Sequence, residues 1–446
     1  MTIAPRNLFQ RINRPTAQRR LLMLGLLYLA VPGIIGWMVA CSPTAASGPS
    51  TQAQPYTFYL LNGFEEEYNL VPLDPETLND QPDGQIVEPG RVGGRVSADG
   101  STLVHLEYPQ GHDPNDPILK PDEVWVVVRD WQTGTVRSRF HPPTNVDPLA
   151  LSEDGARLVL DPDPSSYPSL AEWYVMDTTN GQQLAHVKDA AHFCQRSWFD
   201  PAVQQRIYCL VDPVAQVNGP QPLHLIVYDV ESGAKAGELE LPEVLAGGWE
   251  TDRAVNGQPI WTFLEPAVEL APDGQHIALV HADADKVTLI DAQHLTVKRT
   301  LSLDRRTSLL DWFAPAVAYA KGEMEGTIRQ VVFSPDGQYL YVFSQEARLI
   351  TGEEAPTQRG LWLVDLKQGA IMVEALPELQ VQWVRPAPDG SIYVFGTTDK
   401  RLLPHEIRPS SPSTLWRLDA LTLKTLAKRE FTGYRGSRLI LTQTSK

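Results

Sequence analysis

Five residues with side chains that can ligate metal ions lie in two stretches of the chain that are rich in proline. They are His112, Asp113, Asp116, Asp161 and Asp163. Carboxylate oxygens are the ligands that Ca²⁺ prefers in proteins. Each of the four aspartates is followed by proline, however, which is also typical of ordinary turns. The sequence therefore predicts no cofactor, and Ca²⁺ held by these carboxylates is the alternative.

A second group mixes aromatic and charged side chains, as the binding surfaces of proteins often do. It consists of Trp249, Glu250, Asp252, Arg253 and Trp261. Tryptophan and arginine are enriched among the residues that contribute most to binding. Tryptophan also fills the spaces between structural repeats, so a packing role for the two tryptophans is an equal alternative.

Two more stretches carry candidate binding residues. Within residues 304–327, Trp312 and Phe313 belong to an apolar pattern of near-helical spacing that Pro315 interrupts, which is typical of a short broken helix. This helix either covers the core or docks a partner. A third group could receive an anionic ligand or form a solvated loop; its members are Arg401, His405 and Arg408.

Two of the three cysteines stand on either side of a turn. Cys194 lies six residues before Asp200, and Cys209 lies eight residues after Pro201. A hairpin at this turn would bring the two cysteines together, and a disulfide closing a loop of this length is worth about 3 kcal/mol. A register error of one residue would put them on opposite faces and forbid the bond. We expect a structural disulfide rather than a redox or metal site.

Local motifs for catalysis are missing from the sequence. It contains no G-x-S-x-G, no P-loop, no dinucleotide-binding glycine pattern, no H-E-x-x-H and no C-x-x-C. Serine hydrolysis, phosphoryl transfer, hydride transfer and zinc catalysis therefore lack support in the sequence. A catalytic site assembled from several repeats would leave no local motif, so the sequence predicts no catalytic residue and only disfavours an enzyme.

Two short patterns alternate along residues 57–443 and indicate how the chain is organised. The first is a tight turn, Ser/Ala-x-Asp-Gly, which ends at Gly100, Gly155, Gly274, Gly337 and Gly390, with Asp200-Pro201 as a degenerate copy. The second is an apolar strand that ends in an aspartate, at Asp74, Asp130, Asp177, Asp229, Asp291, Asp365 and Asp419. Together they predict a repeated meander of four antiparallel strands.

These repeats resemble those of YVTN-type and related WD40-like β-propellers, most clearly at Ser334–Val342 and Val287–Asp291. The resemblance implies an all-β, seven-bladed propeller of four-stranded blades over residues 57–446. The bridged hairpin that Cys194 and Cys209 would form also resembles one in the propeller subunit of quinone-dependent amine dehydrogenases.

Ring closure is expected to involve both ends of the propeller. Residues 57–88 supply three strands of the first blade, and the apolar residues 437–443 supply the fourth. Closing the ring in this way removes the exposed strand edges. The short turns would then lie on one face and the longer connections on the other, so we expect the binding surface on the long-loop face, which includes residues 242–266, 304–327 and 396–413.

The first 56 residues predict export and attachment to a membrane. Residues 1–40 combine five arginines with an uncharged apolar run that ends at Cys41, which resembles a bacterial lipobox. Cys41 is therefore the expected lipidation site, with a retained transmembrane anchor as the alternative. Residues 41–56 are small and polar and predict a flexible tether.

Charge and localisation limit the partners that the folded part could have. Without residues 1–40, 33 basic residues face 54 acidic ones, a net charge of −21, so nucleic acid is not expected as a partner. The sequence predicts an extracytoplasmic lipoprotein on the cell surface or the periplasmic side, whose propeller binds a protein, peptide or glycan. The alternative is an enzyme or enzyme subunit, either like the amine dehydrogenase propeller or like propeller lactonases.

Overall fold

The computed structural model describes fifteen ranges of the chain. These are residues 56–62, 69–81, 92–97, 100–108, 121–131, 133–152, 154–162, 169–199, 206–211, 221–253, 259–305, 326–347, 358–397, 413–431 and 439–443. All of them belong to one compact unit, Ala53–Lys446. Among the described residues, no helix is both long and apolar enough to cross a membrane.

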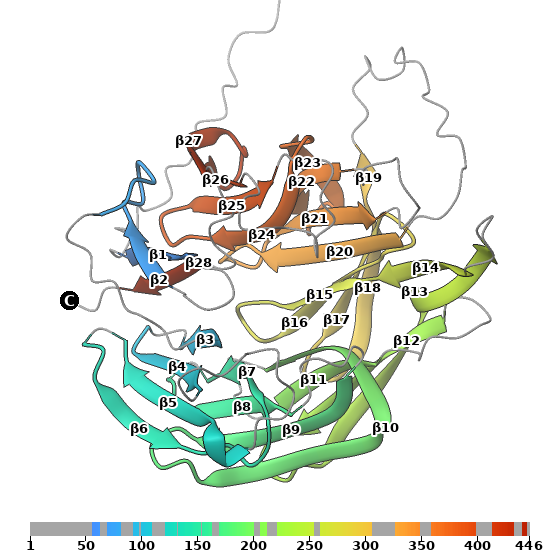
Figure 1. Cartoon of the computed structure of the whole chain (residues 1–446). Coiled ribbons are helices and arrows are strands. Elements are labelled where there is room, and N and C mark those ends of the chain that lie inside the picture. The colour runs from blue at the N-terminus through green and yellow to red at the C-terminus, as the bar shows by residue number, and fades with distance from the viewer. Residues whose placement is uncertain are drawn as a thin grey trace, which may run out of the picture. The chain divides into compact units, whose positions relative to one another are not determined.

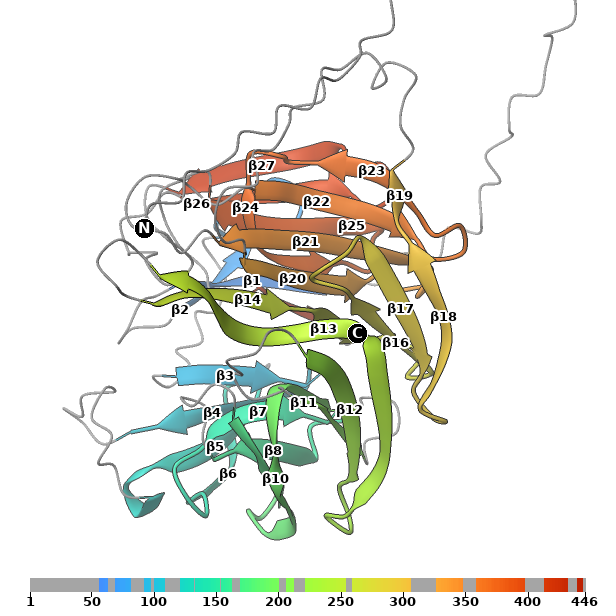
Figure 2. The same cartoon turned by 90° about the vertical axis from the view of Figure 1, so that its right-hand side faces the viewer.

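The described residues form six four-stranded antiparallel blades, here numbered in chain order (Figures 1 and 2). Blade 1 contains β3 (Val92–Val96), β4 (Thr102–Glu107), β5 (Trp125–Asp130) and β6 (Val136–Phe140), with the short 3-10 helix η2 (Pro121–Glu123) before β5. Blade 2 contains β7 (Asp147–Leu151), β8 (Arg157–Asp161), β9 (Ser169–Asp177) and the first half of β10 (Gln183–Phe199). Blade 3 contains the second half of β10, β11 (Arg206–Val211), β12 (Gln221–Asp229) and the first part of β13 (Lys235–Arg253).

The second half of the chain repeats the same arrangement. Blade 4 contains β15 (Ala267–Leu270), β16 (His276–Val280), β17 (Lys286–Asp291) and β18 (Thr296–Ser302). Blade 5 contains β20 (Gly326–Phe333), β21 (Tyr339–Ala347), β22 (Gln358–Asp365) and β23 (Ala370–Ala375). Blade 6 contains β24 (Gln380–Pro386), β25 (Ser391–Thr397), β26 (Ser413–Asp419) and β27 (Thr425–Phe431). Two strands lie outside the blades, β14 (Pro259–Glu265) and the short β19 (Asp304–Arg305).

The prediction of seven four-stranded blades is wrong. Beside the six blades, the described residues contain one sheet of three strands, in the order β2 (Asn69–Leu73), β1 (Tyr56–Asn62) and β28 (Leu439–Gln443). The count of seven assigned a complete blade to every strand that ends in aspartate, but such an aspartate marks the end of one strand and does not show that a fourth strand follows. Residues 82–88, where that strand was expected, lie outside the described residues.

The expected pairing of the two chain ends is confirmed. β28 is antiparallel to β1, with Ile440 opposite Tyr59 and Leu441 opposite Phe58. In Figure 1 the red strand β28 lies beside the blue strands β1 and β2. The last strand of the chain therefore completes a sheet that begins with the first.

Hydrogen bonds within the turns stabilise the connections between strands, as the repeats predict. In the turn after β5, the carboxylate of Asp130 accepts a hydrogen bond from the backbone N–H of Thr133 at 2.9 Å, and Gly134 adopts a φ of 69°. In three of these turns, a leucine occupies the position with a positive φ in place of glycine. These are Leu78, Leu295 and Leu423. Such a backbone costs about 1 kcal/mol or more in a leucine. Burial offsets this cost, because Leu78 is fully buried.

Apolar clusters lie between consecutive blades and form the core. One cluster joins blades 1 and 2 through Val126 and Leu158, and another joins blades 4 and 5 through Val287 and Val342. Leu73 of the three-stranded sheet packs with Phe395 of blade 6. Because each blade buries its faces against its neighbours, the core is divided among the interfaces between them.

The first strands of the blades are the innermost ones. β3 contacts β7, β7 contacts β10, β15 contacts β20 and β20 contacts β24. In a propeller, the first strands surround the central channel. Side chains on these strands pack into the clusters between blades, as Val331 does between blades 4 and 5 and Val384 does between blades 5 and 6.

Candidate functional site

The predicted disulfide between Cys194 and Cys209 is confirmed. The two Cα atoms are 5.4 Å apart, and both side chains are buried. The cysteines are not direct partners across the strands: Cys209 on β11 lies opposite Ser197, and Cys194 on β10 lies opposite Val211. An irregularity between Cys194 and Arg196 shifts the register of β10. This shift brings the cysteines to bonding distance.

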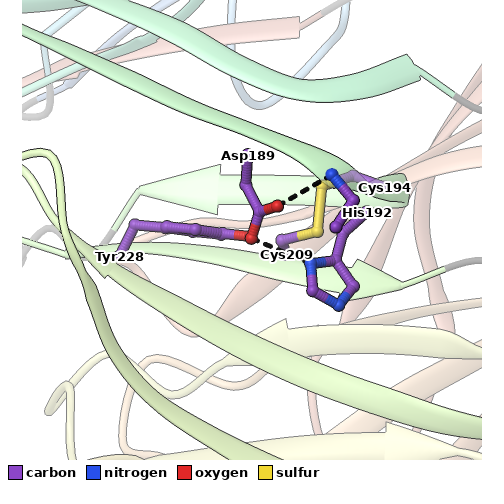
Figure 3. The surroundings of a disulfide bond; sticks show 6 residues. Asp189, His192, Cys194, Cys209 and Tyr228 are labelled. Carbon is purple, nitrogen blue, oxygen red and sulfur yellow. Dashed lines mark hydrogen bonds and ion pairs between the residues drawn. A yellow bond between two sulfur atoms is a disulfide. The ribbon is translucent and has the colours of Figure 1, made fainter.

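A network of polar side chains lies beside the disulfide (Figure 3). One carboxylate oxygen of Asp189 accepts hydrogen bonds from Tyr228 Oη at 3.0 Å and from His192 Nδ1 at 2.8 Å. Its other oxygen accepts the N–H of Ala191 at 2.9 Å. Burial raises the pKa of Asp189, but these hydrogen bonds outweigh it and lower the pKa below its ordinary value. Burial and Asp189 together raise the pKa of Tyr228.

This network stabilises the point where β10 passes from blade 2 to blade 3. Asp189 is the last residue of β10 that pairs regularly with β9, and the register shifts between Asp189 and Phe193. Every donor around Asp189 comes from the same crossover or from β12. The arrangement fixes an irregular stretch of backbone and keeps Asp189 ionised, so we interpret it as structural.

The predicted group at Trp249–Trp261 falls on a ribbon formed by β13 and β14, whose base at Leu264 and Glu265 also pairs in parallel with β20 of blade 5. Residues 242–266 were expected to be a loop, and that expectation is wrong. β13 continues beyond Ala246, its last residue paired with β12, and pairs instead with β14. Trp249 lies opposite Thr262, and Glu250 lies opposite Trp261. In register, Asp252 and Arg253 follow at the far end of the ribbon, opposite Ile260 and Pro259.

Most of the other predicted site residues lie outside the described residues. They are Cys41, Asp113, Asp116, Asp163, Trp312, Phe313, Arg401, His405 and Arg408. Among the described residues, no group of three or more histidine, cysteine or acidic side chains could hold a metal ion. Ca²⁺ binding thus stays a prediction.

Asp161 is the one described member of the candidate Ca²⁺ ligands, and the structure places another aspartate opposite it. Asp161 ends β8 and pairs in register with Asp147 on β7. Burial raises the pKa of Asp147. Burial and the charge of Asp147 raise the pKa of Tyr108, the residue after β4, to about 12. Asp147 stands 14 residues before Asp161 in the sequence, so no local spacing linked the two.

Blade 1 contains a buried histidine that sequence reasoning did not single out. His105 on β4 is 1% exposed, and its Nε2 accepts a hydrogen bond from Nε of Arg129 at 2.9 Å. Burial, reinforced by the charge of Arg129, lowers the pKa of His105 to about 4. The imidazole is therefore neutral at pH 7. Its Nε2 lies 4.0 Å from Glu107, whose carboxylate instead forms salt bridges with Arg129 and Arg139.

The innermost strands carry charged residues that the sequence reading also missed. Arg95 on β3, Glu269 on β15 and Arg385 on β24 each stand two residues before the Ser or Ala that opens a short turn. The signal that could have found them is this constant offset from the Ser/Ala-x-Asp-Gly motif. Arg95 donates from Nε to the carbonyl oxygen of Leu149 on the neighbouring strand β7, at 3.0 Å.

Comparisons with known proteins give no family for this chain. No family model matches it, and no curated protein matches it. Among solved structures, it is similar to the dihydro-heme d1 dehydrogenase NirN, with 12% identity, a TM-score of 0.42, and coverage of 88% of this chain and 77% of that one. It is also similar to the Swd1 β-propeller domain of Myceliophteria thermophila, with 11% identity, a TM-score of 0.42, and coverage of 79% and 88%. A third is the hydrazine synthase of Kuenenia stuttgartiensis, with 16% identity, a TM-score of 0.41, and coverage of 75% and 80%. Similarities at this level carry no inference about the function of this chain.

Proposed function

We propose that this chain is an extracytoplasmic propeller, tethered to a membrane through Cys41, that binds a protein or peptide partner with the β13–β14 ribbon. The anchor is supported by the lipobox-like residues that end at Cys41 and by the polar tether of residues 41–56. The binding role is supported by the structure that the chain adds between blades 3 and 4.

The ribbon is the observation that carries the binding proposal. Blades 2 and 3 are joined by a single continuous strand, β10, and blades 5 and 6 by the short turn from Leu376 to Leu379. Between blades 3 and 4 the chain instead extends β13 and adds β14, which belongs to none of the six blades (Figure 2). Structure added to a rigid scaffold is where recognition usually lies.

The composition of the ribbon fits a surface that binds another polypeptide. Its paired backbone brings Trp249, Glu250 and Trp261 into two successive register positions. Tryptophan gives a large contact area at a small entropic cost, and adjacent charges give orientation.

The aspartates of the turns do not point to an alternative, catalytic function. Asp130, Asp229 and Asp419 each accept backbone N–H groups within their own turns. The pKa of both Asp130 and Asp229 is lowered, with the backbone N–H of Thr133 as the largest cause for Asp130 and the hydroxyl of Ser232 as the largest cause for Asp229. Their role is to close turns, which makes them poor general bases.

Co-purification from the native membrane tests the binding proposal. The full chain and its W249A/W261A double variant are cross-linked in cells, solubilised and isolated, and their partners are identified by mass spectrometry. We expect a stoichiometric partner with the wild type and its loss with the variant. Leu426→Ala is the matched control, because Leu426 is a 53% exposed apolar residue on β27, outside the ribbon. If the double variant retains the partner, the ribbon is not the site; if the wild type isolates none, the binding role is wrong.

The anchor is tested separately with Cys41→Ser. We expect the wild type to incorporate a radiolabelled fatty acid and to fractionate with membranes, and the variant to do neither. A variant that stays in the membrane fraction would show that the apolar segment before Cys41 is itself the anchor.

A further inference from the structure

One position in the turns between the third and fourth strands sets blade 6 apart. It is the second residue after the aspartate that ends the third strand. In blade 6 the backbone N–H of Leu421 donates to the carboxylate of Asp419 at 3.2 Å, as that of Gln293 does to Asp291 in blade 4 at 3.0 Å. Every other turn of this kind has a polar or charged residue at this position. These residues are Glu76, Gln132, Thr179, Glu231, Gln293 and Lys367.

The turn itself does not require a leucine at this position, and the side chain of Leu421 is not packed. It is 55% exposed, the highest value for a large apolar residue in the described part of the chain, and Leu426 on β27 of the same hairpin is 53% exposed. Leu423, by contrast, is buried. Single exposed leucines are common on protein surfaces. Two on one hairpin, at a place where the other turns carry polar residues, indicate a contact surface. We call Leu421 and Leu426 the blade 6 tip.

The blade 6 tip belongs to the end of the fold at which the chain enters. β1 begins with Tyr56 and is antiparallel to β2, with Phe58 opposite Leu73. Leu73 is the residue before the turn at Asp74. The entry point therefore lies at the end of the fold that carries these turns.

Blade 6 is also the neighbour of this entry point. The hydroxyl of Tyr393 on β25 donates to the carbonyl oxygen of Pro75 at 3.1 Å, and Nη1 of Arg429 on β27 donates to that of Leu78 at 2.7 Å. Both acceptors belong to the turn after β2. The hairpin of β26 and β27 thus lies beside the sheet that begins with β1.

The predicted tether is short enough to hold a membrane close to this end. Fourteen residues separate Cys41 from Tyr56. A flexible chain of that length has an average end-to-end distance of about 20 Å and a maximum of about 50 Å. The same reach applies if the apolar segment before Cys41 is the anchor. A surface held this near needs only weak contacts to dock, because its effective concentration is high.

The charges of the hairpin suit a lipid surface. Residues 419–430 contain three basic and two acidic side chains, whereas the whole chain has a net charge of −16. Two of the basic residues, Lys424 and Lys428, are exposed. Segments that lie in the membrane interface combine apolar and basic side chains in this way. An acidic surface is repelled by anionic lipids, and this hairpin avoids that repulsion.

We propose that the blade 6 tip docks into the lipid interface of the membrane to which the chain is tethered. The proposal rests on the membrane anchor proposed above and not on the ribbon. It sets the orientation of the propeller, since the end with the short turns then faces the lipid. β13 begins after the turn at Asp229 and reaches the ribbon at its other end, so the ribbon lies at the end away from the membrane.

Fluorescence quenching by lipids tests the contact. The full chain is reconstituted in vesicles of phosphatidylcholine in which some lipids carry a quencher near the headgroup, and an environment-sensitive dye is attached to one introduced cysteine. Wild type treated with the dye gives the background. We expect the dye at Leu421→Cys to be quenched severalfold more than the dye at Gln293→Cys, because Gln293 has the matched position in the turn of blade 4.

A second set of variants tests the leucines themselves. The dye is placed at Thr425→Cys, an exposed position between them. Quenching there should fall severalfold when Leu421→Gln and Leu426→Gln are added, because the polar side chains stay in water. Leu184→Gln, on β10 and 45% exposed, is the matched control and should leave the quenching unchanged. All three leucines are exposed, so no variant should change the melting temperature. Leu426→Ala stays a control for the ribbon, whose partner is identified after the membrane has been solubilised.

Flotation of the vesicles separates the docking from the anchor. A chain that does not float with the vesicles has no anchor, and the docking falls with it. A chain that floats but shows equal quenching at Leu421→Cys and Gln293→Cys is anchored and does not dock. Quenching that survives Leu421→Gln with Leu426→Gln would also overturn the docking. So would shielding of the dye at Leu421→Cys without vesicles at high protein concentration, which would assign the tip to contact with a second copy of the chain.

Discussion

Lowering the pH should destabilise the fold through His105 between pH 6.5 and 4. An exposed histidine in the unfolded chain titrates near 6.5, whereas burial lowers the pKa of His105 in the fold to about 4. The folded state therefore binds fewer protons than the unfolded state in this range, and stability rises with pH. The stabilisation is complete above pH 6.5 and is lost as pH falls through the folded value.

The size of the effect follows from this pKa difference. Linkage gives a loss of about 2 kcal/mol at pH 5 and about 3 kcal/mol at pH 4, relative to neutral pH. No discount for solvent screening applies, since the side chain is 1% exposed. In His105→Gln, the amide oxygen can still accept the hydrogen bond from Arg129 Nε, but no proton is taken up.

Urea denaturation at pH 7.5, 6, 5 and 4.5 measures the free energy of unfolding of the wild type and of His105→Gln. Other groups contribute equally to both proteins, so the difference between them isolates the histidine. The variant should lose about 2 kcal/mol less than the wild type between pH 7.5 and pH 5. Parallel curves for the two proteins would refute the assignment of a low pKa to His105.

Three more predictions concern the stability of the fold. Replacing Cys194 and Cys209 by serine, or reducing their disulfide, should lower the free energy of unfolding by about 3 kcal/mol, as urea titration with and without a reductant would measure. Deleting β28 (Leu439–Gln443) should abolish cooperative thermal unfolding, because β1 loses one of its two neighbouring strands; a truncated chain that melts like the full one would contradict the closure. Gly396→Ala should destabilise by several kcal/mol in the same titration, because its Cβ would lie 2.2 Å from the carbonyl oxygen of Gln380.

Features marked by a local rule could be predicted from the sequence. The turns follow from the chemistry of aspartate and glycine, and the disulfide from two cysteines on either side of one turn. The pairing of β28 with β1 follows from the need to cover strand edges. The number of complete blades could not be predicted, because the aspartate at position 74 reports only the end of β2.

The ribbon and the inner charges were missed for different reasons. Residues 247–266 contain Gly247, Gly248 and Pro266, which weaken the alternation that predicts a strand, and only pairing in three dimensions makes β13 continuous with the ribbon. Arg385 reads as an ordinary surface charge in the sequence. Only its constant offset from the Ser/Ala-x-Asp-Gly motif marks it as a residue of an innermost strand.

The pairing of Tyr56 with Gln443 has a consequence for the handling of this protein. The chain enters and leaves the fold at the same end of one strand pair, so the two termini of the propeller are neighbours. A short linker between them should allow circular permutation, with new ends opened in a turn such as that after Asp130. A domain fused behind Gln443 would likewise start beside Tyr56, the first residue of β1.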